Sequence, residues 1–453
     1  MFQRGVLDNL TKWAKKADRK PLVLRGARQV GKTTLVGLFS KNFTQYLYLN
    51  LELAADKKPF EDFSTIDVMV QTLFYEKNLA YAKKKSTLIF VDEIQALPEA
   101  LQILRYFYEQ QPGIHVIAAG SLLETLFDAN ISFPVGRVEY LIVRPVSFIE
   151  FLAAIGETTA LQQLHTIPLN DFAYDKLLAL FHTYAILGGM PEVVKNYAAE
   201  KDLTALKNIY ESLLTSYIDD VEKYAGSQAQ VQHIRHAIQA SYALAGKRIK
   251  FEGFGKSNYG SREMGEALRT LEKALLLHLI YPVTDVVLPL LPDKKKSPRL
   301  QLLDTGLMNY SIGIQKEILG SKDLNKVYEG VVIEHLVGQE LLTLEQGNIH
   351  GLHFWAREKK TAMAEVDYIY KFGTKLIPIE VKSGATGTLK SLHLYMDMAP
   401  HNMAIRFCAA PKNITAITTT AGKKYFLLTL PYFAVAKIEE YLIWFEEEVK
   451  KMK

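Results

Sequence analysis

The chain has one cysteine, Cys408, among its 453 residues, and this scarcity excludes several kinds of chemistry. One thiol cannot form an internal disulfide, and it cannot supply a metal cluster built on cysteine. The apolar residues around it, 404–410, predict a buried strand rather than a reactive site. The chemistry of this chain therefore rests on other residue types.

Long hydrophobic runs are also missing. The longest apolar tract, 274–280, is interrupted by His278 and is far too short to span a bilayer. Residues 1–20 are basic and amphipathic but contain no continuous apolar segment, so they do not have the pattern of a secretory signal. These absences predict a cytoplasmic protein without a membrane partner.

The chain also has no large excess of positive or negative charge, since its formal net charge is only +5. A balance this modest does not by itself indicate a nucleic-acid partner. Lysine clusters do occur at 83–85, 294–296 and 359–360, in or beside expected loops. Such runs are usually solvated loop tips, and contact with nucleic acid is the alternative.

The most informative stretch that is present is residues 26–34, GARQVGKTT, which has the spacing of a phosphate-binding P-loop. Residues 22–24 predict a buried strand, and residues 34–39 have apolar positions at helical spacing. A glycine-rich turn between a strand and a helix N-terminus is the setting that a P-loop requires, and a plain glycine turn is the alternative. The predicted nucleotide-binding residues are Gly26, Ala27, Arg28, Gln29, Val30, Gly31, Lys32, Thr33 and Thr34.

Each part of this loop has a physical role in holding a nucleotide. Gly26 and Gly31 let backbone N–H groups point at the phosphates, and the dipole of the following helix adds positive potential. Lys32 is expected to reach the β- and γ-phosphates, and Thr33 to offer its hydroxyl to Mg²⁺. The loop therefore predicts ATP and Mg²⁺ as cofactors.

A second group of chemical residues follows the apolar run 88–91, where the sequence continues with Asp92 and Glu93. The run predicts a buried parallel strand, and carboxylates at its C-terminal end would lie where open α/β sheets bind ligands. We expect Asp92 to hold Mg²⁺ through water and Glu93 to polarise the attacking water. Alone, the pattern fits a strand that ends in two solvated acids, but after a P-loop it predicts hydrolysis.

These motifs resemble those of a known family. The sequences GARQVGKTT, LIFVDEIQ, HVIAAGS, FPVGRVEYLIVRPVSFIEF and LGGMP are similar to those of a widespread bacterial and archaeal AAA+-type ATPase family. Its members carry a C-terminal domain of unknown function that is related to nucleases. The resemblance covers nearly the whole chain, and it implies an extra strand between the P-loop strand and the Asp-Glu strand.

The resemblance also implies residues that sense the γ-phosphate. Ser121, at a strand end, is implied as a sensor, and Arg137 as an arginine finger or sensor. Arg105 and Arg144 compete with Arg137 for this role, and a surface arginine before a strand is the plain alternative. An arginine finger can act from a neighbouring subunit, which would make a second copy of the chain a partner.

The patterns along the chain divide it into four parts and predict an α/β fold. Residues 1–150 alternate strand-like and helix-like segments, as the parallel sheet of an AAA+-like P-loop ATPase core requires. Residues 151–225 have a helical pattern with a break at LGGMP, and we expect them to form a lid. Residues 226–310 predict a winged-helix-like domain, and residues 311–453 an α/β nuclease-like domain.

The winged-helix prediction rests on the order of elements in the third part. Helical patterns at 231–245 and from Ser261, the expected cap, precede candidate wing strands at 276–283 and 299–303. The basic loop 293–297 lies between these strands. A winged helix contacts DNA bases with its second helix and phosphates with the wing. The alternative is a connector that packs one domain against another.

Acidic residues with the spacing of a metal site occur near the C-terminus, at Asp367 and in residues 376–384, LIPIEVKSG. Alternation along a strand puts Glu380 and Lys382 on one face, and a turn at 372–374 brings Asp367 beside them. Two carboxylates make an oxygen-rich Mg²⁺ site, and a nearby lysine can stabilise a hydroxide nucleophile. The alternative is an amphipathic hairpin whose charged face is exposed to solvent and binds no metal ion.

This arrangement resembles the core of the PD-(D/E)xK nuclease superfamily. Glu334, in the preceding helical segment, matches the acidic residue of that superfamily's first helix. The resemblance implies a second Mg²⁺ site at Glu334, Asp367 and Glu380, with Lys382 as a catalytic residue. The proline that usually precedes the first aspartate is absent, which weakens the motif. Pro378 predicts an edge strand or a bulge.

The sequence thus predicts an ATP-hydrolysing protein and leaves the use of ATP open between two hypotheses. In the first, ATP hydrolysis drives or gates the binding or cleavage of DNA, which the complete C-terminal acid and lysine set favours. In the second, the protein is a switch-like NTPase whose C-terminal domain binds a protein or nucleic acid without cutting. The modest positive charge favours this second hypothesis.

Overall fold

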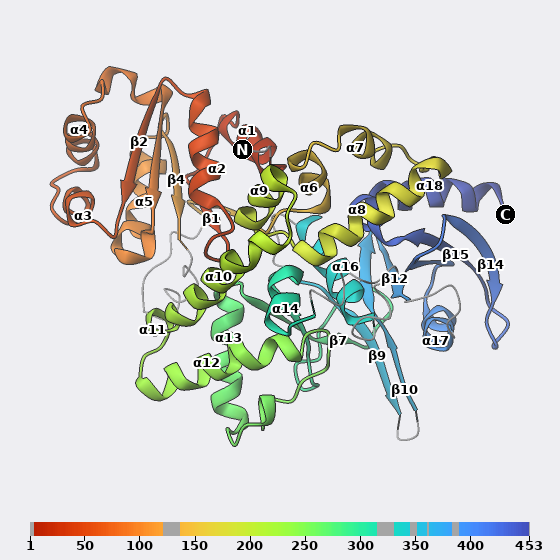
Figure 1. The fold of residues 1–453 in the computed structure, drawn as a ribbon. Coiled ribbons are helices and arrows are strands. Elements are labelled where there is room, and N and C mark those ends of the chain that lie inside the picture. The colour runs from red at the N-terminus through yellow and green to blue at the C-terminus, as the bar shows by residue number, and fades with distance from the viewer. Residues whose placement is uncertain are drawn as a thin grey trace.

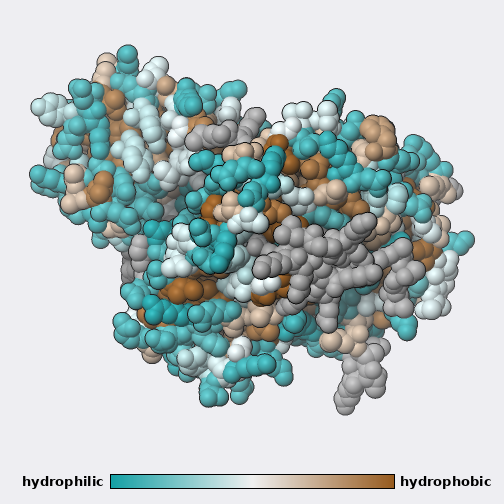
Figure 2. Space-filling view, in the orientation of Figure 1, coloured by the Kyte–Doolittle hydropathy of each residue, from teal (hydrophilic) through white to brown (hydrophobic). Residues whose placement is uncertain are grey.

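The structure is a computed structural model, and it describes residues 4–120, 136–314, 330–344, 351–359, 362–382 and 389–452 (Figure 1). Within these ranges no helix combines the length and the apolar character that crossing a bilayer demands. The N-terminal sheet and the C-terminal sheets lie at opposite sides of the molecule in Figure 1, with helices between them. On the face drawn in Figure 2, hydrophobic residues lie in separate patches on a mostly hydrophilic surface.

The N-terminal part is a five-stranded parallel sheet with the order β2-β3-β4-β1-β5. Strand β4 lies between β1, which leads into the glycine-rich loop, and β3, which ends at Asp92. The extra strand that the resemblance implied is therefore confirmed. The strands are β1 (Leu22–Arg25), β2 (Gln45–Asn50), β3 (Thr87–Asp92), β4 (His115–Ala119) and β5 (Glu139–Ile142).

Helices cover both faces of this sheet. In β3, Leu88 and Phe90 pack into one hydrophobic core, whereas Ile89 and Val91 pack into another. A strand that is buried on both faces has apolar residues at successive positions, which explains the continuous apolar run before Asp92. The first core includes α1 (Val6–Ala14) and α2 (Lys32–Phe39), and the second includes α3 (Ala54–Glu61), α4 (Ile66–Glu76) and α5 (Glu99–Gln110).

Residues 148–224 contain helices and no strand, as the sequence predicted. The LGGMP break separates α8 from α9, and Pro191 is the first residue of α9, where a missing N–H costs no hydrogen bond. The predicted boundary between residues 150 and 151 falls inside α6, so the division into domains stays a prediction. The helices are α6 (Phe148–Ala154), α7 (Thr158–Leu164), α8 (Tyr174–Leu187), α9 (Pro191–Glu200), α10 (Lys207–Asp219) and α11 (Val221–Tyr224).

The third part has the two helices and the antiparallel strand pair that the sequence predicted, with two differences. Gly260, not Ser261, is the N-cap of α13, and Ser261 is already helical, so that prediction was wrong. The first candidate wing strand ends at Ile280, and β7 (Pro282–Val283) pairs instead with β9 of the C-terminal part. The elements are α12 (Gln228–Ala243), α13 (Ser261–Lys273), β6 (Leu277–Ile280) and β8 (Arg299–Leu302).

The C-terminal part combines a five-stranded mixed sheet, β11-β12-β13-β15-β14, with a three-stranded sheet, β10-β9-β7. Strand β12 lies inside its sheet in regular register, so the prediction of an edge strand or a bulge at Pro378 was wrong. The proline is tolerated because pairing with β13 begins at Ile379. Cys408 is buried in β13, as predicted. The elements are α14 (Thr305–Ser311), α16 (Val331–Leu344), β9 (Phe354–Lys359), β10 (Ala362–Val366), β11 (Tyr368–Phe372), β12 (Lys375–Val381), α17 (Lys390–Met398), β13 (Met403–Cys408), β14 (Asn413–Thr418), β15 (Lys424–Pro431) and α18 (Ile438–Lys451).

Buried polar contacts fix the helical part to helix α16. The Glu340 Oε1 atom accepts hydrogen bonds from the Tyr184 hydroxyl at 2.8 Å and from the Phe148 N–H at 3.0 Å. Gln339 accepts a hydrogen bond from the Thr305 N–H at 2.9 Å. Burial raises the pKa of Glu340 to about 7. Helix α16 is therefore held against both α8 and the start of α14.

Candidate functional sites

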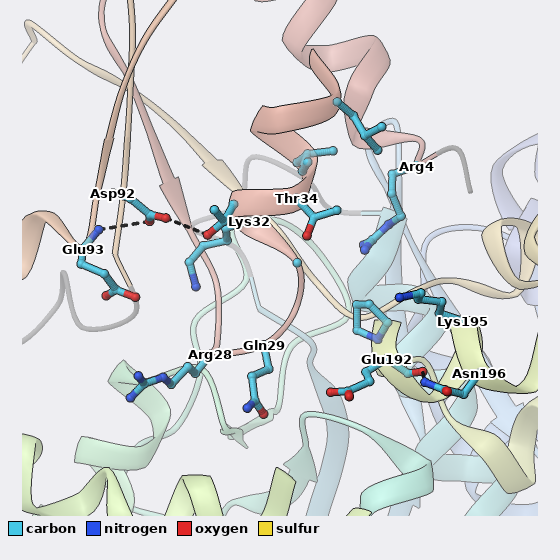
Figure 3. A pocket seen from close by; sticks show the side chains of 15 residues that line it. Arg4, Arg28, Gln29, Lys32, Thr34, Asp92, Glu93, Glu192, Lys195 and Asn196 are labelled. Carbon is cyan, nitrogen blue, oxygen red and sulfur yellow. Dashed lines mark hydrogen bonds between the residues drawn. The ribbon is translucent and has the colours of Figure 1, made fainter. Parts of the chain in front are cut away.

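A pocket of about 530 Å³ lies where the glycine-rich loop, the end of β3 and helix α9 meet (Figure 3). The C-terminal ends of β1 and β3 lie at one edge of the sheet because the strands are parallel. Most of the predicted loop residues line the pocket together with the acids that follow β3. The lining residues from these elements are Arg28, Gln29, Gly31, Lys32, Thr33, Thr34, Asp92 and Glu93.

The backbone of the loop explains both of its glycines. A Cβ atom on Gly26 would lie 2.4 Å from the carbonyl oxygen of Val143, so the loop passes directly against the segment after β5. Gly31 has a φ of 91°, which side chains rarely allow, and it is the N-cap of α2. The N-terminal N–H groups of α2 and their positive dipole end therefore lie beside the pocket.

Two carbonyl oxygens hold the Lys32 side chain over the loop. Its Nζ atom donates to the oxygens of Gly26 at 2.8 Å and Ala27 at 2.9 Å. Burial lowers the pKa of this amine to about 8, while the charges of Glu93 and Asp92 oppose that shift. Phosphate oxygens would compete well with the two carbonyls, because a hydrogen bond between charged groups is stronger than one to a neutral acceptor.

The hydroxyl of Thr33 and the carboxylate of Asp92 are already in contact. The Thr33 Oγ1 atom donates to Asp92 Oδ2 at 2.7 Å. Burial raises the pKa of Asp92, and the hydrogen bond from Thr33 opposes this rise. Hydroxyl and carboxylate oxygens are ligands of the kind that Mg²⁺ prefers, so this donor set fits a magnesium ion that accompanies a nucleotide.

Glu93 has an unusual backbone. Its φ of 51° lies in the left-handed region, which costs a residue other than glycine about 1 to 3 kcal/mol and is typical of functional sites. Its N–H donates to Asp92 Oδ1 at 3.1 Å, and its side chain accepts a hydrogen bond from Gln95. The turn after β3 thus places the second carboxylate in the lining of the pocket.

Arg28 ties the loop to the helical part. Its guanidinium forms an ion pair with Asp220, which follows α10, and its carbonyl oxygen accepts a hydrogen bond from the Tyr217 hydroxyl at 3.0 Å. Asp220 stands between α10 and α11, close before α12 in the chain. The loop that would hold phosphates is therefore bonded to the segment that leads into the third part.

The predicted sensors differ in their positions. Ser121 lies outside the described residues. Arg137 lies at the N-terminal edge of the sheet, because Glu139 pairs with Leu22 at the start of β1, and the loop lies at the opposite edge. The Arg137 guanidinium forms an ion pair with Glu109 at 3.0 Å. Arg137 thus cannot act on the pocket of its own subunit as arranged, and a role in a neighbouring pocket stays a prediction.

Neither competing arginine is among the described residues that line the pocket. Arg105 is exposed and donates to the Tyr106 hydroxyl at 2.5 Å. The Arg144 Nη1 atom lies 3.2 Å from His278 Nε2. Burial, with the charge of Arg144, lowers the pKa of His278 to about 3. His278 is thus a packed residue rather than a free ligand.

Four pocket residues on α9, and Arg4 before α1, were missed by reasoning from the sequence. The α9 residues are Pro191, Glu192, Lys195 and Asn196. The last three are spaced so that they share one helix face, and Figure 3 shows them across the pocket from Asp92. The proline after LGGMP marked the helix start, but nothing local indicated what the helix would face.

Arg4 is buried against the loop although it lies far from it in the sequence. Its Nε atom is 3.0 Å from Glu150 Oε2, and its Nη2 atom donates to the Arg144 carbonyl at 2.7 Å. Its Nη1 atom donates to the Val30 carbonyl at 3.3 Å. Arg4 therefore joins the loop, the segment after β5 and the start of α6.

The predicted C-terminal residues also lie near one another. The Asp367 Oδ2 atom accepts a hydrogen bond from the Val381 N–H at 2.7 Å, which fixes the bend before β11 against the end of β12. Lys382 forms an ion pair with Glu380. Burial raises the pKa of Glu380, the charge of Asp367 adds to this rise, and Lys382 opposes it. The Asp367 carboxylate thus lies at the end of β12, the strand end at which Glu380 and Lys382 pair with each other.

A cation that the sequence did not reveal lies among these acids. Arg299, the first residue of β8, has a side chain that is only 8% exposed. Its Nη1 atom is 2.6 Å from Glu334 Oε1 and 3.9 Å from Asp367 Oδ1, and its Nη2 atom is 3.0 Å from Glu365 Oε2. Burial raises the pKa of Glu334, and the charge of Arg299 opposes this rise.

As arranged, these acids do not fit the second Mg²⁺ ion that the sequence predicted. Within the part of the chain that the structure describes, no group of three or more His, Cys, Asp or Glu side chains is placed to hold a metal ion. The guanidinium of Arg299 instead neutralises the carboxylates of Glu334 and Glu365. The roles assigned to Glu334, Asp367, Glu380 and Lys382 stay predictions.

Comparison with known families divides the chain into three matching stretches. Residues 18–152 match a family described as an AAA domain. Residues 178–318 match a domain of unknown function (DUF8612), and residues 326–420 match another (DUF4143). The third stretch contains the C-terminal acids, and neither description assigns them an activity. No curated protein matches the chain.

Three solved structures match part of the chain. The Walker-type ATPase PABY2304 of Pyrococcus abyssi is 13% identical with a TM-score of 0.43, and the match covers 69% of this chain and 96% of that one. The Aeropyrum pernix ORC1 protein in complex with DNA is 14% identical with a TM-score of 0.28, covering 69% and 91%. Drosophila ORC bound to DNA is 18% identical with a TM-score of 0.24, covering 58% and 65%. At these TM-scores the likenesses carry no argument about this chain.

The family match and the geometry agree on the N-terminal part. Both the glycine-rich loop and the acids after β3 lie within the matched residues 18–152. They lie at one edge of a five-stranded parallel sheet, in which β4 separates the two strands that precede them. The N-terminal part of the chain therefore fits a P-loop α/β domain of the AAA type.

Gly26→Ala and Gly37→Ala make a matched pair that tests the loop geometry. The first adds a methyl group against a backbone oxygen, so we expect the loop to shift and the affinity for ATP to fall at least tenfold. The second lies in α2 with no atom within 4 Å of its Cβ, and alanine there should stabilise the protein by about 0.5 to 1 kcal/mol. Binding of a fluorescent ATP analogue and thermal unfolding measure both effects. Equal ATP affinities in the two variants would contradict the geometry.

Proposed function

We propose that this protein binds ATP with Mg²⁺ and hydrolyses it in the pocket between the glycine-rich loop and α9. The observation that carries the proposal is the convergence of Lys32, the Thr33–Asp92 pair and Glu93 on one pocket of about 530 Å³. Phosphoryl transfer needs positioning and charge rather than covalent chemistry from the protein. These side chains supply both.

Each side chain has a separate role in this proposal. Lys32 leaves the carbonyl oxygens of Gly26 and Ala27 to bind the β- and γ-phosphates. Thr33 and Asp92 hold Mg²⁺, directly and through water, and the ion supplies charge neutralisation at the phosphates when bound. Glu93 orients and polarises the attacking water.

Helix α9 and Arg4 complete the site on the side away from Asp92. Lys195 and Arg4 place two cations beside an anionic ligand. Arg4 is fixed by its ion pair with Glu150, whereas Lys195 comes from the helical part that we propose acts as a lid. Closure over a nucleotide would then change the position of α9 relative to the loop.

The roles of Lys32 and Glu93 can be separated by two substitutions. Lys32→Ala removes a cation from the phosphates, so ATP affinity should fall at least tenfold. Glu93→Gln keeps the shape of the pocket and removes the carboxylate, so ATP affinity should stay within about threefold while the hydrolysis rate falls at least a hundredfold. Calorimetry and a phosphate-release assay measure the two quantities. Hydrolysis at the wild-type rate by Glu93→Gln would show that Glu93 is not the catalytic carboxylate.

A role of Arg137 in a neighbouring pocket can be tested by mixing. Because Arg137 lies at the sheet edge opposite the loop, it can serve only the pocket of another subunit. Arg137→Ala and Glu93→Gln proteins should each be inactive, and their mixture should recover part of the ATPase activity. Lack of recovery, together with a monomeric mass in the presence of ATP, would refute the assignment.

For the C-terminal part, we propose that it binds a protein or nucleic acid and does not cut nucleic acid. In this proposal, ATP in the N-terminal part controls what the third and the C-terminal parts bind. The placement of Arg299 among the acids favours binding over cleavage, because a guanidinium cannot generate a metal-bound nucleophile. ATP-driven cleavage of DNA remains the competing proposal.

Nucleic acid is the ligand that we propose for the third part. Residues 226–310 contain twelve Lys and Arg against seven Asp and Glu. Lys294 and Lys295 are exposed in the loop between the strands, and Arg262 on α13 is exposed as well. Contacts of such side chains with phosphates release counterions, so binding should weaken steeply as salt rises.

This proposal predicts different effects from two lysine pairs. Replacing Lys294 and Lys295 with glutamine should weaken DNA binding and reduce the slope of log affinity against log salt by up to about 2. Replacing Lys83 and Lys85, which are exposed on the ATPase part, removes the same charge and should leave both quantities unchanged. Fluorescence anisotropy at several salt concentrations measures them. Equal losses in both variants, or no DNA binding by the wild type, would refute this interface and favour a protein partner.

A further inference from the structure

The C-terminal acids are neutralised by side chains from another part of the chain. Arg299 pairs with Glu334 and Glu365 through the two ends of its guanidinium. Beside it, the Arg248 Nη1 atom lies 2.8 Å from Glu358 and 2.9 Å from Glu365. Lys296 lies 3.1 Å from Glu358. The cations of this interface come from residues 248–299, and the carboxylates come from α16, β9 and β10.

Within this interface, Arg299 occupies a built site for a cation. Besides its two ion pairs, its Nη1 atom donates to the Asp367 carbonyl oxygen at 3.2 Å. Its guanidinium carbon lies 4.6 Å from the centre of the Phe354 ring, within the range of a cation–π contact. Carboxylates, a carbonyl oxygen and a ring face thus surround one buried positive charge.

The same oxygens are the ones that a divalent ion would use. Glu334 Oε1 and Asp367 Oδ1 both face the Nη1 atom of Arg299, at 2.6 Å and 3.9 Å. A Mg²⁺ ion bound by both oxygens at about 2.0 to 2.1 Å would lie close to the Nη1 atom of Arg299, and the two positive charges would repel each other. The Glu380 Oε2 atom is a further candidate ligand, because it is buried and accepts no hydrogen bond from any described residue.

We propose that Arg299 is an internal cation that takes the place of a divalent metal ion at the acids Glu334, Asp367 and Glu380. While Arg299 is in place, the C-terminal part binds no divalent ion there. When Arg299 is withdrawn or replaced, the same acids bind Mg²⁺ or Mn²⁺. The inference rests on the metal-site character that the sequence predicts for these acids, and it does not require that the protein hydrolyse ATP.

The test is a Mn²⁺ titration of the full chain without nucleotide, followed by electron paramagnetic resonance and calorimetry. Each protein is compared with the same protein carrying Asp367→Asn. The Mn²⁺ binding that is lost with Asp367→Asn is assigned to this site, which separates it from Mn²⁺ bound at Thr33 and Asp92. The wild type should show no binding that depends on Asp367. Arg299→Gln should bind one additional Mn²⁺ at least tenfold more tightly than any Asp367-dependent binding in the wild type, and Arg299→Gln with Asp367→Asn should lose it.

Arg248→Gln is the matched control. It removes a guanidinium from the same interface, but Arg248 contacts Glu358 and Glu365 rather than Glu334 or Asp367. Its Mn²⁺ binding should equal that of the wild type. An equal gain from Arg248→Gln and Arg299→Gln would mean that general loss of positive charge, not the place of Arg299, controls the metal, and it would overturn the proposal.

Two further results would overturn it. One is Asp367-dependent Mn²⁺ binding by the wild type that is as tight as in Arg299→Gln. The other is a folded Arg299→Gln protein, verified by circular dichroism, that gains no Mn²⁺ site. If Arg299→Gln does not fold, Arg299→Lys keeps the charge but lacks the two separate NH₂ groups with which Arg299 reaches Glu334 and Glu365, and it should gain measurable Mn²⁺ binding. A phosphate-release assay on the same proteins reports the ATPase proposal separately.

Discussion

The nucleotide pocket depends on the parallel register of three strands. Strand β4 pairs with β3 on one side and with β1 on the other, and all three run in the same direction. This arrangement brings the loop after β1 and the acids after β3 to one edge, with one strand between them. The gap is bridged by the hydrogen bond between Thr33 and Asp92, the two residues that we propose hold a magnesium ion. Without this register, the two motifs would be unrelated stretches of sequence.

The wall of the pocket that α9 forms depends on contacts far from the sheet. The Gly189 N–H, in the turn before α9, donates to the Asp304 Oδ2 atom at 2.5 Å, and the Leu307 N–H donates to its Oδ1 atom at 3.0 Å. Burial raises the pKa of Asp304 to about 6, and these N–H groups oppose the rise. Asp304 lies two residues after the end of β8, the strand that begins with Arg299. The same short segment of the chain therefore carries Arg299 and holds the turn before α9.

The sequence predicted what is encoded in contiguous residues. The loop, the acids after β3 and the C-terminal hairpin each lie within a few residues, and local spacing determines which side chains meet. It did not predict Arg4, the polar face of α9 or Arg299, because each of these enters its site from a distant segment through tertiary packing. The interior position of the strand that contains Pro378 was missed for a similar reason, because its pairing with β11 and β13 is set by strands that lie elsewhere in the sequence.

The same packing changes what the charge of the chain means. By sequence, residues 226–310 carry a net positive charge. In the structure, however, Arg248, Lys296 and Arg299 form ion pairs with carboxylates of the C-terminal part. The positive potential that a nucleic acid would meet is therefore weaker than the number of Lys and Arg residues suggests. The negative charge that a metal ion would meet at the C-terminal acids is reduced as well. Both properties are limited by one interface. Arg299 pairs with Glu334 and Glu365, so the residue that lowers the free positive charge of the third part also lowers the free negative charge of the C-terminal part.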